Sequence, residues 1–233
     1  MLATVIDGPR AVSNRLSPPP FAAAANDTAE SVSAFDGIGT AVVLRRDQAL
    51  FFEGDPAQHC FKVVSGMVRS CRLLADGRRH VNQFLVPGDF VGLESDDTYR
   101  FTLEAVSDAT LMRYPRRAMD QLVERQPRLG KCLLGLMSDG LSAAQAQMLL
   151  LGRKSAVERL ASFLLSLSRR AGESDHIALA MTRSDIADYL GLTIETVSRI
   201  FSQLKSRGVI QLKASNEVVI RRRHQLQEIA DAA

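Results

Sequence analysis

The sequence predicts an α+β chain, with short strands in its first half and helices in its second. Short apolar runs separated by turn residues follow one another from Thr40 to Tyr114. A long helical pattern begins at Pro127, and two closely spaced amphipathic helices lie between Thr182 and Gly208. The length of 233 residues, with 46% hydrophobic content, is sufficient for two modest domains.

Residues 1–35 contain three consecutive prolines, Pro18 to Pro20, and an alanine run, without helical or strand periodicity. We expect a flexible N-terminal arm here, although a short strand or helix that folds back on the partner domain is also compatible with the sequence. Apolar runs stay well below the roughly 18 residues of a membrane helix. The first residues also lack the apolar core of a signal peptide. A cytoplasmic location without membrane contact is expected.

The first predicted domain, residues 36–115, alternates strand patterns with turn signals, as all-β sandwiches and rolls do. The candidate strands are AVVL, ALFF, CFKVV, MVRSCRLL, HVNQFLV, RFTLEAV and TLMRY. Asp76-Gly77, between two alternating runs, is the strongest hairpin signal.

Residues 116–152 predict a short helix and then a long one with Pro127 as its first residue. Apolar and small residues recur along the long helix at alternating spacings of four and three, the pattern of a heptad seam. Such a helix either packs on its own first domain or pairs with its twin, and small residues at Gly140 and Ala143 favour the pair. The predicted dimer residues are Leu129, Leu133, Leu136, Gly140, Ala143, Gln147 and Leu150.

Residues 153–233 form the second predicted domain, which starts where Gly152-Arg153-Lys154 interrupts the seam. Ser155 and Glu158 can form a capping box for a supporting amphipathic helix that extends to about Arg170. After the helices, VIQLK and VVIRRR flank the turn ASNE and predict a β-hairpin.

Two short helices joined by a glycine-containing turn predict a helix-turn-helix between these elements. Thr182 and Asp185 can form a capping box, Gly191 can end the first helix, and Thr193 can cap the second. The core face of the second helix is expected to comprise Val197, Ile200, Phe201 and Leu204. A three-helix bundle with a solvated polar face is the alternative for this stretch.

The outer face of the second helix carries groups that match base edges and phosphates. Arg199 can bond a guanine through two donors, Glu195 can accept from a cytosine amino group, and Ser198 can bond or pack against a neighbouring base. The phosphate candidates are Arg183, Ser184, Thr193, Thr196, Lys205 and Lys213. Residues 153–233 carry 13 Lys and Arg against 9 Asp and Glu, so the basic excess lies with this motif.

The run Glu195-Thr196-Val197-Ser198-Arg199 resembles the recognition signature of the CRP/FNR family, and the stretches FFEGDPAQHCFKVVSGMVR and PGDFVGLE resemble the β-roll of that family. The resemblance implies an N-terminal cyclic-nucleotide-binding-like β-roll, a long dimerisation helix and a C-terminal winged helix-turn-helix. It also implies a transcription activator that contacts RNA polymerase and binds double-stranded DNA as a homodimer, on an inverted repeat close to TTGAT…ATCAA. With Ser198 in this run and Ile194 just before it, the sequence resembles the FNR branch of the family rather than the cyclic-AMP receptor branch.

The sequence does not suggest a cofactor. The segment 92–101, where a nucleotide phosphate would bind, is short and acidic, and Arg100 is its obvious cationic candidate. An iron–sulfur cluster needs four thiolates, whereas the chain has three cysteines, at positions 60, 71 and 132, which we expect to be buried as small hydrophobes.

The four histidines form no ligand spacing, so no metal is expected. No pattern of a nucleophile with its base appears, which argues against an enzyme. The chain is most similar to FixK-type regulators of oxygen-limitation or nitrogen-fixation genes. A ligand- or haem-gated sensor-regulator of the same family is the alternative.

Overall fold

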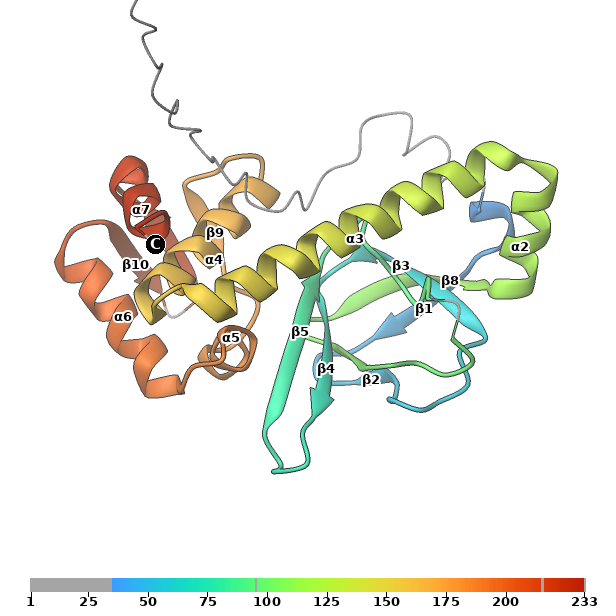
Figure 1. Ribbon diagram of the computed structural model, residues 1–233, viewed down its shortest axis with the longest axis horizontal. Coiled ribbons are helices and arrows are strands. Elements are labelled where there is room, and N and C mark those ends of the chain that lie inside the picture. The colour runs from blue at the N-terminus through green and yellow to red at the C-terminus, as the bar shows by residue number, and fades with distance from the viewer. Residues whose placement is uncertain (1–34, 95, 215, 233) are drawn as a thin grey trace, which may run out of the picture.

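The structure, a computed structural model, describes residues 35–94, 96–214 and 216–232. It consists of an N-terminal β-roll, a long helix and a C-terminal helical domain with a small sheet (Figure 1). The predicted α+β class and its three parts are confirmed. The predicted arm lies outside the described residues except for Phe35, which is buried with its ring 6.1 Å from that of Tyr114.

Two four-stranded antiparallel sheets form the β-roll, with strand orders β1-β8-β3-β6 and β2-β7-β4-β5. The strands are β1 (Thr40–Leu44), β2 (Ala49–Phe51), β3 (His59–Ser65), β4 (Val68–Leu73), β5 (Arg79–Leu85), β6 (Phe90–Val91), β7 (Thr102–Ala105) and β8 (Ala109–Pro115). All predicted strands are present, and the two-residue β6 was not predicted because it is too short to show periodicity. Apolar side chains such as Phe61, Leu103 and Leu111 fill the space between the sheets.

Two glycines shape the turns that flank β4. Gly77 has a φ of 82° in the predicted Asp76-Gly77 hairpin between β4 and β5. Gly66, between β3 and β4, has a φ of 77°, and a Cβ at this position would lie 2.1 Å from the carbonyl oxygen of Asp108. A side chain at Gly66 would therefore push two neighbouring turns of the roll apart.

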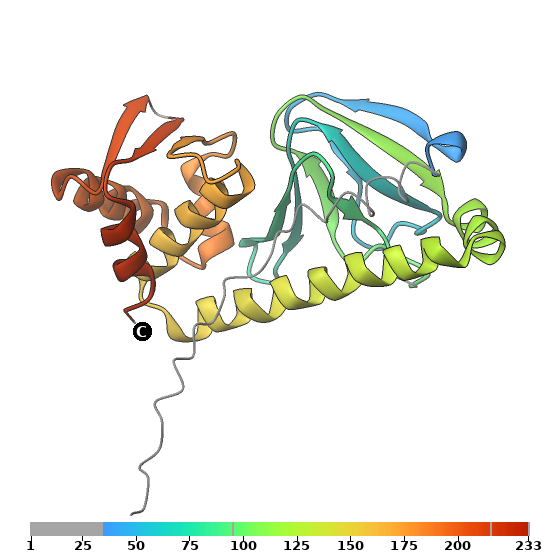
Figure 2. The same ribbon diagram turned by 90° about the horizontal axis from the view of Figure 1, so that it is seen from above.

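A 3-10 turn (Asp36–Ile38) precedes the roll, and the helices α2 (Arg116–Arg125) and α3 (Pro127–Arg153) follow it. Pro127 begins α3 as predicted, since a first-position proline loses no helical hydrogen bond. With 27 residues, α3 is about 40 Å long. It runs along one side of the roll from α2 to the C-terminal domain (Figures 1 and 2). Among the helices of the described residues, none is both long and apolar enough to span a membrane.

The C-terminal domain contains α4 (Ala156–Arg170), β9 (His176–Ala178), α5 (Arg183–Leu190), α6 (Ile194–Ser206), β10 (Ile210–Ala214), β11 (Glu217–Ile220) and α7 (Arg223–Ala230). The predicted capping box of Ser155 and Glu158 begins α4, and the predicted hairpin is β10–β11. The third strand β9 and the helix α7 were not predicted. β9 has three residues, and α7 begins without a side-chain cap, so neither carries a strong local signal.

Candidate DNA-reading site

The start of α5 is fixed by the predicted capping box. The Thr182 hydroxyl oxygen accepts a hydrogen bond from the Asp185 amide at 3.1 Å. In return, one Asp185 carboxylate oxygen accepts from the Thr182 amide at 3.0 Å and from the Thr182 hydroxyl at 2.8 Å. These bonds satisfy donors that every helix leaves free in its first turn.

The turn between α5 and α6 also follows the predicted chemistry. Gly191 ends α5 with a φ of 63°, a conformation that residues with a Cβ rarely adopt. Thr193 caps α6 through its hydroxyl oxygen, which accepts from the Thr196 amide at 3.2 Å. The two helices therefore leave the turn in a defined relative orientation, which a helix-turn-helix needs to present its second helix.

The inner face of α6 is buried in the core that it shares with α4 and α5. The four predicted core residues Val197, Ile200, Phe201 and Leu204 are all buried. Their spacing of three and four residues leaves the opposite side of the helix open. In Figure 1, α6 lies at the outer side of the C-terminal domain, away from the β-roll.

The three predicted base-reading residues share this open side of α6. Glu195, Ser198 and Arg199 are exposed, and they lie three and four positions apart on one helical face. A carboxylate, a hydroxyl and a guanidinium thus project together from the first two turns of the helix. These are the turns that contact base edges when a recognition helix enters the major groove.

The carboxylate of Glu195 is held in its ionised form. Hydrogen bonds from its own amide and from the Thr193 side chain, together with the charge of Arg199, keep the pKa of Glu195 below its usual value. An ionised carboxylate is purely an acceptor, so at neutral pH Glu195 can accept from a cytosine amino group but cannot donate to a base.

The predicted phosphate-contacting residues differ in how exposed they are to solvent. Thr193, Lys205 and Lys213 are exposed, whereas Ser184 and Thr196 are half-buried. The Thr193 and Thr196 hydroxyls lie 3.0 Å apart and bond to each other. Lys213 lies 3.5 Å from the Glu217 carboxylate across the hairpin.

Arg183 differs from the other phosphate candidates because its guanidinium packs inside the domain. The guanidinium carbon lies 3.3 Å from the centre of the Phe201 ring. Its Nη1 atom is buried and has no hydrogen-bond partner among the described residues. Burial also lowers the pKa of Arg183. The side chain thus stacks on the core face of α6, and a phosphate contact would have to compete with that cation–π contact.

Further exposed cations near the C-terminal end of α6 were not among the predicted site residues. Arg207 caps that end of the helix, and the Arg222 guanidinium lies within 4 Å of the position that a Cβ on Gly208 would take. Both are exposed, as is Arg221. The sequence signal for Arg221 and Arg222 is the arginine run 221–223. Arg223 differs from its neighbours, because it pairs with Asp175 at 2.7 Å.

The predicted dimer residues on α3 lie largely against the rest of the same chain. Leu129 is buried, and Leu133 packs on the same cluster of roll and α2 residues. Leu150 packs on the core of the C-terminal domain, and the Gln147 side-chain amide donates to the Tyr189 carbonyl at 3.1 Å. Gly140, in the middle of the set, is exposed. Most of this face therefore holds the long helix on its own domains.

A second apolar row on α3 is exposed to solvent. Each of its residues follows one of the predicted dimer residues by one position, so the spacing again alternates between three and four. The row comprises Leu134, Met137, Leu141, Ala144 and Met148. Met148 is 73% exposed and Leu134 is 68% exposed. We refer to these five residues as the exposed seam. Apolar residues in such a continuous row are characteristic of a helix that pairs with another one.

Aromatic side chains occupy the interior of the roll beside the segment 92–101. The buried rings of Phe51 and Tyr99 are stacked with centroids 3.7 Å apart, and Phe61 packs against Phe51 at 5.6 Å. Arg100, the cationic candidate for a phosphate site, is exposed and paired with Asp96. The one cation predicted for a nucleotide phosphate is therefore bonded within its own segment.

The cysteines and carboxylates are the remaining side chains that could act as ligands of a metal or cluster. Cys60 and Cys71 are buried as predicted, and Cys132 is half-buried. In the part of the chain that the structure describes, His, Cys, Asp and Glu side chains form no group of three that could hold a metal ion.

Comparison with known proteins agrees with this geometry. The family model of the Crp-like helix-turn-helix domain matches residues 158–229, and that of the cyclic nucleotide-binding domain matches residues 41–126. The nitrogen fixation regulation protein FixK of Azorhizobium caulinodans is 41% identical over 222 residues, which cover 93% of this chain and 90% of that protein. The transcriptional activatory protein AadR of Rhodopseudomonas palustris is 39% identical over 167 residues, or 70% of each chain.

A solved structure has the same fold over most of the chain. The structure of FixK2 from Bradyrhizobium japonicum is similar with a TM-score of 0.80 and 39% identity, covering 84% of this chain and 99% of that chain. The capped helix pair with its open polar face, behind a β-roll and a long helix, defines a DNA-binding transcription regulator. The chain belongs to the CRP/FNR family and is similar to its FixK members. The prediction that it is not an enzyme is confirmed by this membership.

Proposed function

We propose that the chain is a transcription activator that binds as a homodimer to an inverted repeat of the TTGAT…ATCAA type. The observation that carries this proposal is the common exposed face of Glu195, Ser198 and Arg199 on α6. Arg199 donates two hydrogen bonds to the guanine of each half-site, Glu195 accepts from the cytosine amino group, and Ser198 contacts a neighbouring base. Thr193, Thr196, Lys205 and Lys213 contact phosphates, as does Ser184 near the start of α5.

The homodimer forms along α3. The predicted dimer residues lie on this helix. The side chains of the exposed seam, each one position after a predicted residue, are open to solvent, which favours a contact through the seam instead of through the predicted set. Pairing there removes apolar surface from water and leaves the contacts of Leu129, Gln147 and Leu150 with their own domains intact. Two recognition helices in successive major grooves, about 34 Å apart, then match a palindromic operator.

The dimer is competent without a small ligand, a metal or an iron–sulfur cluster. Supporting this, the Phe51 and Tyr99 rings stack inside the roll, and Arg100 is paired with Asp96 rather than open to a phosphate. FixK and AadR, which are similar in sequence, are named as a nitrogen fixation regulator and a transcriptional activator. By that similarity, the chain activates genes of oxygen limitation or nitrogen fixation, in contact with RNA polymerase and in the cytoplasm.

The test is the binding of the purified, ligand-free protein to a TTGAT…ATCAA duplex and to the same duplex with both guanines replaced. Fluorescence anisotropy at two or more stated salt concentrations separates base reading from phosphate attraction. We expect tight binding to the first duplex and a loss of about 1–3 kcal/mol per replaced guanine. Equal, weak binding to both duplexes would contradict the proposal and favour a ligand- or haem-gated regulator.

A further inference from the structure

The helix-turn-helix formed by α5 and α6, called the reading unit below, packs directly on the β-roll. The contact is between α5 and β5. Figures 1 and 2 show these two elements side by side. Three aromatic rings form the centre of the contact: Phe84 of β5, Phe163 of α4 and Tyr189 of α5, with centroids 5.3 to 6.3 Å apart. All three side chains are buried. The aromatic centre supplies apolar burial, and its three ring pairs are tilted, as aromatic pairs prefer.

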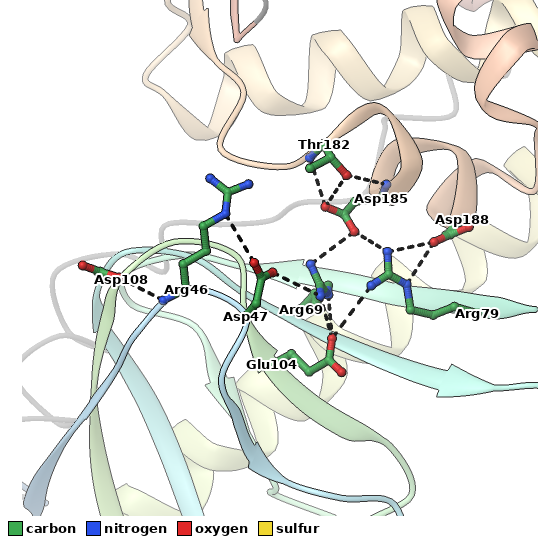
Figure 3. Close-up of polar contacts among 9 residues, drawn as sticks. All are labelled: Arg46, Asp47, Arg69, Arg79, Glu104, Asp108, Thr182, Asp185 and Asp188. Atoms are coloured by element: carbon green, nitrogen blue, oxygen red, sulfur yellow. Dashed lines mark hydrogen bonds and ion pairs between the residues drawn. The ribbon is translucent and has the colours of Figure 1, made fainter.

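Charged side chains surround this centre on the side of the start of α5. Arg69 of β4 donates to Asp185 at 3.2 Å and to Glu104 at 2.7 Å. Arg79 of β5 pairs with the same Asp185 oxygen and with Asp188 at 2.9 Å. We call Arg69, Arg79, Glu104, Asp185 and Asp188 the inter-domain ion cluster (Figure 3).

Arg69 and Asp185 are shielded from water, whereas the side chains of Arg79, Glu104 and Asp188 are 24–28% exposed. The Arg69 side chain is 8% exposed and that of Asp185 is 3% exposed. In such surroundings charged hydrogen bonds are strong and sensitive to geometry, because water cannot replace a lost partner. A buried ion pair adds little net stability compared with an apolar contact, yet removing one partner leaves an unpaired buried charge. The cluster is therefore better suited to fix an orientation than to increase the stability of the fold.

The cluster also acts on the reading unit itself through Asp185. One oxygen of this carboxylate caps α5 by bonding to Thr182, while the other oxygen meets Arg69 and Arg79. Asp188 lies one turn further along α5 and meets Arg79. Two successive turns of α5 are thus held by guanidinium groups that belong to the β-roll.

We propose that Arg69 and Arg79 are positioning residues for DNA reading. They hold α5, and with it α6, at one angle to the roll, and so set the separation of the two recognition helices in the dimer. The inference rests on the proposed palindrome-binding dimer. Free rotation of the two reading units would remove the preference for one half-site spacing, although each α6 would still read its bases.

The experiment compares Arg79→Gln with the parent on two operators. One is the TTGAT…ATCAA duplex, and the other has two base pairs added between its half-sites. The matched control is Arg78→Gln, the same change at the neighbouring residue, which is 79% exposed and pairs within its own hairpin with Asp76. Hydrogen exchange of α5 and β5 reports on domain packing without DNA.

We expect Arg79→Gln to bind the first operator roughly 5- to 150-fold more weakly than the parent, the usual range of a coupling between two sites. Binding to the lengthened operator should change little, so that the preference for spacing declines. Discrimination against the guanine-replaced duplex, measured as for the proposed function, should remain. Exchange in α5 and β5 should rise in Arg79→Gln and stay at the parental level in Arg78→Gln.

Two results would overturn the proposal. One is an unchanged preference for half-site spacing, which includes an equal loss of affinity on both operators, and the other is tighter binding of the first operator by Arg79→Gln. If Arg79→Gln does not fold, Asp188→Asn removes one contact of the cluster without touching the Thr182 cap. A parent that does not discriminate guanine contradicts the proposed function instead. In that case the exchange data alone decide on the cluster, and unchanged exchange in Arg79→Gln refutes it.

Discussion

Asp185 of α5 and Arg79 of β5 form an ion pair between the two domains, although 106 residues separate them in the sequence. The Asp185 carboxylate also caps α5 through Thr182. A single side chain therefore serves both the local start of the reading motif and the packing of that motif on the β-roll. Changes at this position should affect the stability of the protein and not only its DNA binding.

The stability contributed by Asp185 should depend on pH. Burial raises the pKa of Asp185, but the Thr182 hydrogen bonds and the charges of Arg69 and Arg79 outweigh it, so that the pKa lies below the ordinary 3.8. An acid with a lowered native pKa stabilises the fold above its unfolded pKa, and this contribution disappears as the pH falls through the native pKa. The parent should therefore lose this part of its stability below about pH 4.

Asp185→Asn should consequently be less stable than the parent by about 3 kcal/mol at pH 7, because it leaves buried guanidinium groups short of a charge partner. This difference in the free energy of unfolding between parent and variant should become smaller as the pH falls below about 4. Urea unfolding at several pH values measures it, with Asp97→Asn, a change at an exposed acid, as the control. A gap that is the same at every pH would rule out the ionised carboxylate as the cause.

Arg199→Lys tests the reading of guanine. Lysine retains the positive charge but loses the planar pair of donors that meets both guanine acceptors. The affinity for the guanine-containing operator should fall by about 1–3 kcal/mol for each half-site, while binding to the guanine-replaced operator changes little. Lys205→Gln is the comparison: it should weaken both complexes alike and reduce the salt slope by about two, one for each subunit of the dimer. Undiminished guanine preference in Arg199→Lys would assign the base contact to another residue.

Leu141→Glu tests the exposed seam. Leu141 is 61% exposed in the single chain, so the change should not disturb its fold. In a dimer paired along this row the new carboxylate would be buried without a partner, at a cost of several kcal/mol, and dimer dissociation should rise about 100-fold or more. Light scattering after size exclusion gives the mass. Leu73→Glu, at a 70% exposed leucine of the β4–β5 hairpin, should remain dimeric. A dimeric Leu141→Glu would place the contact elsewhere.

Local chemistry made much of this fold predictable from the sequence. The capping boxes at Ser155 and Thr182, the glycine turn at Gly191 and the buried face of α6 each depend on residues a few positions apart. The free face of α3 depends instead on what covers the helix. A shift of one residue rotates a helix position by about 100°, so two parallel seams were compatible with the spacing.

Contacts between residues far apart in the chain could not be predicted from the sequence in the same way. Arg79 belongs to a basic hairpin run that suggests a solvated turn, and its partners Asp185 and Asp188 become neighbours only when the domains pack. Arg183 was equally ambiguous. A basic residue in the first turn of a helix-turn-helix suits a phosphate contact, and its stacking on Phe201 is visible only in the folded chain.

The thiols of Cys60 and Cys71 should react slowly with alkylating reagents. Burial raises the pKa of both thiols to about 11. At pH 8 roughly one in a thousand such groups is ionised, and the thiolate is the reactive form. In the native protein, iodoacetamide should therefore modify Cys132, which is half-buried, faster than the other two. Mass spectrometry of the digested protein gives the extent at each site, with urea-unfolded protein as the reference in which all three react. Rapid modification of Cys60 or Cys71 under native conditions would mean that the β-roll opens around them, so that their burial in the closed roll does not protect these thiols.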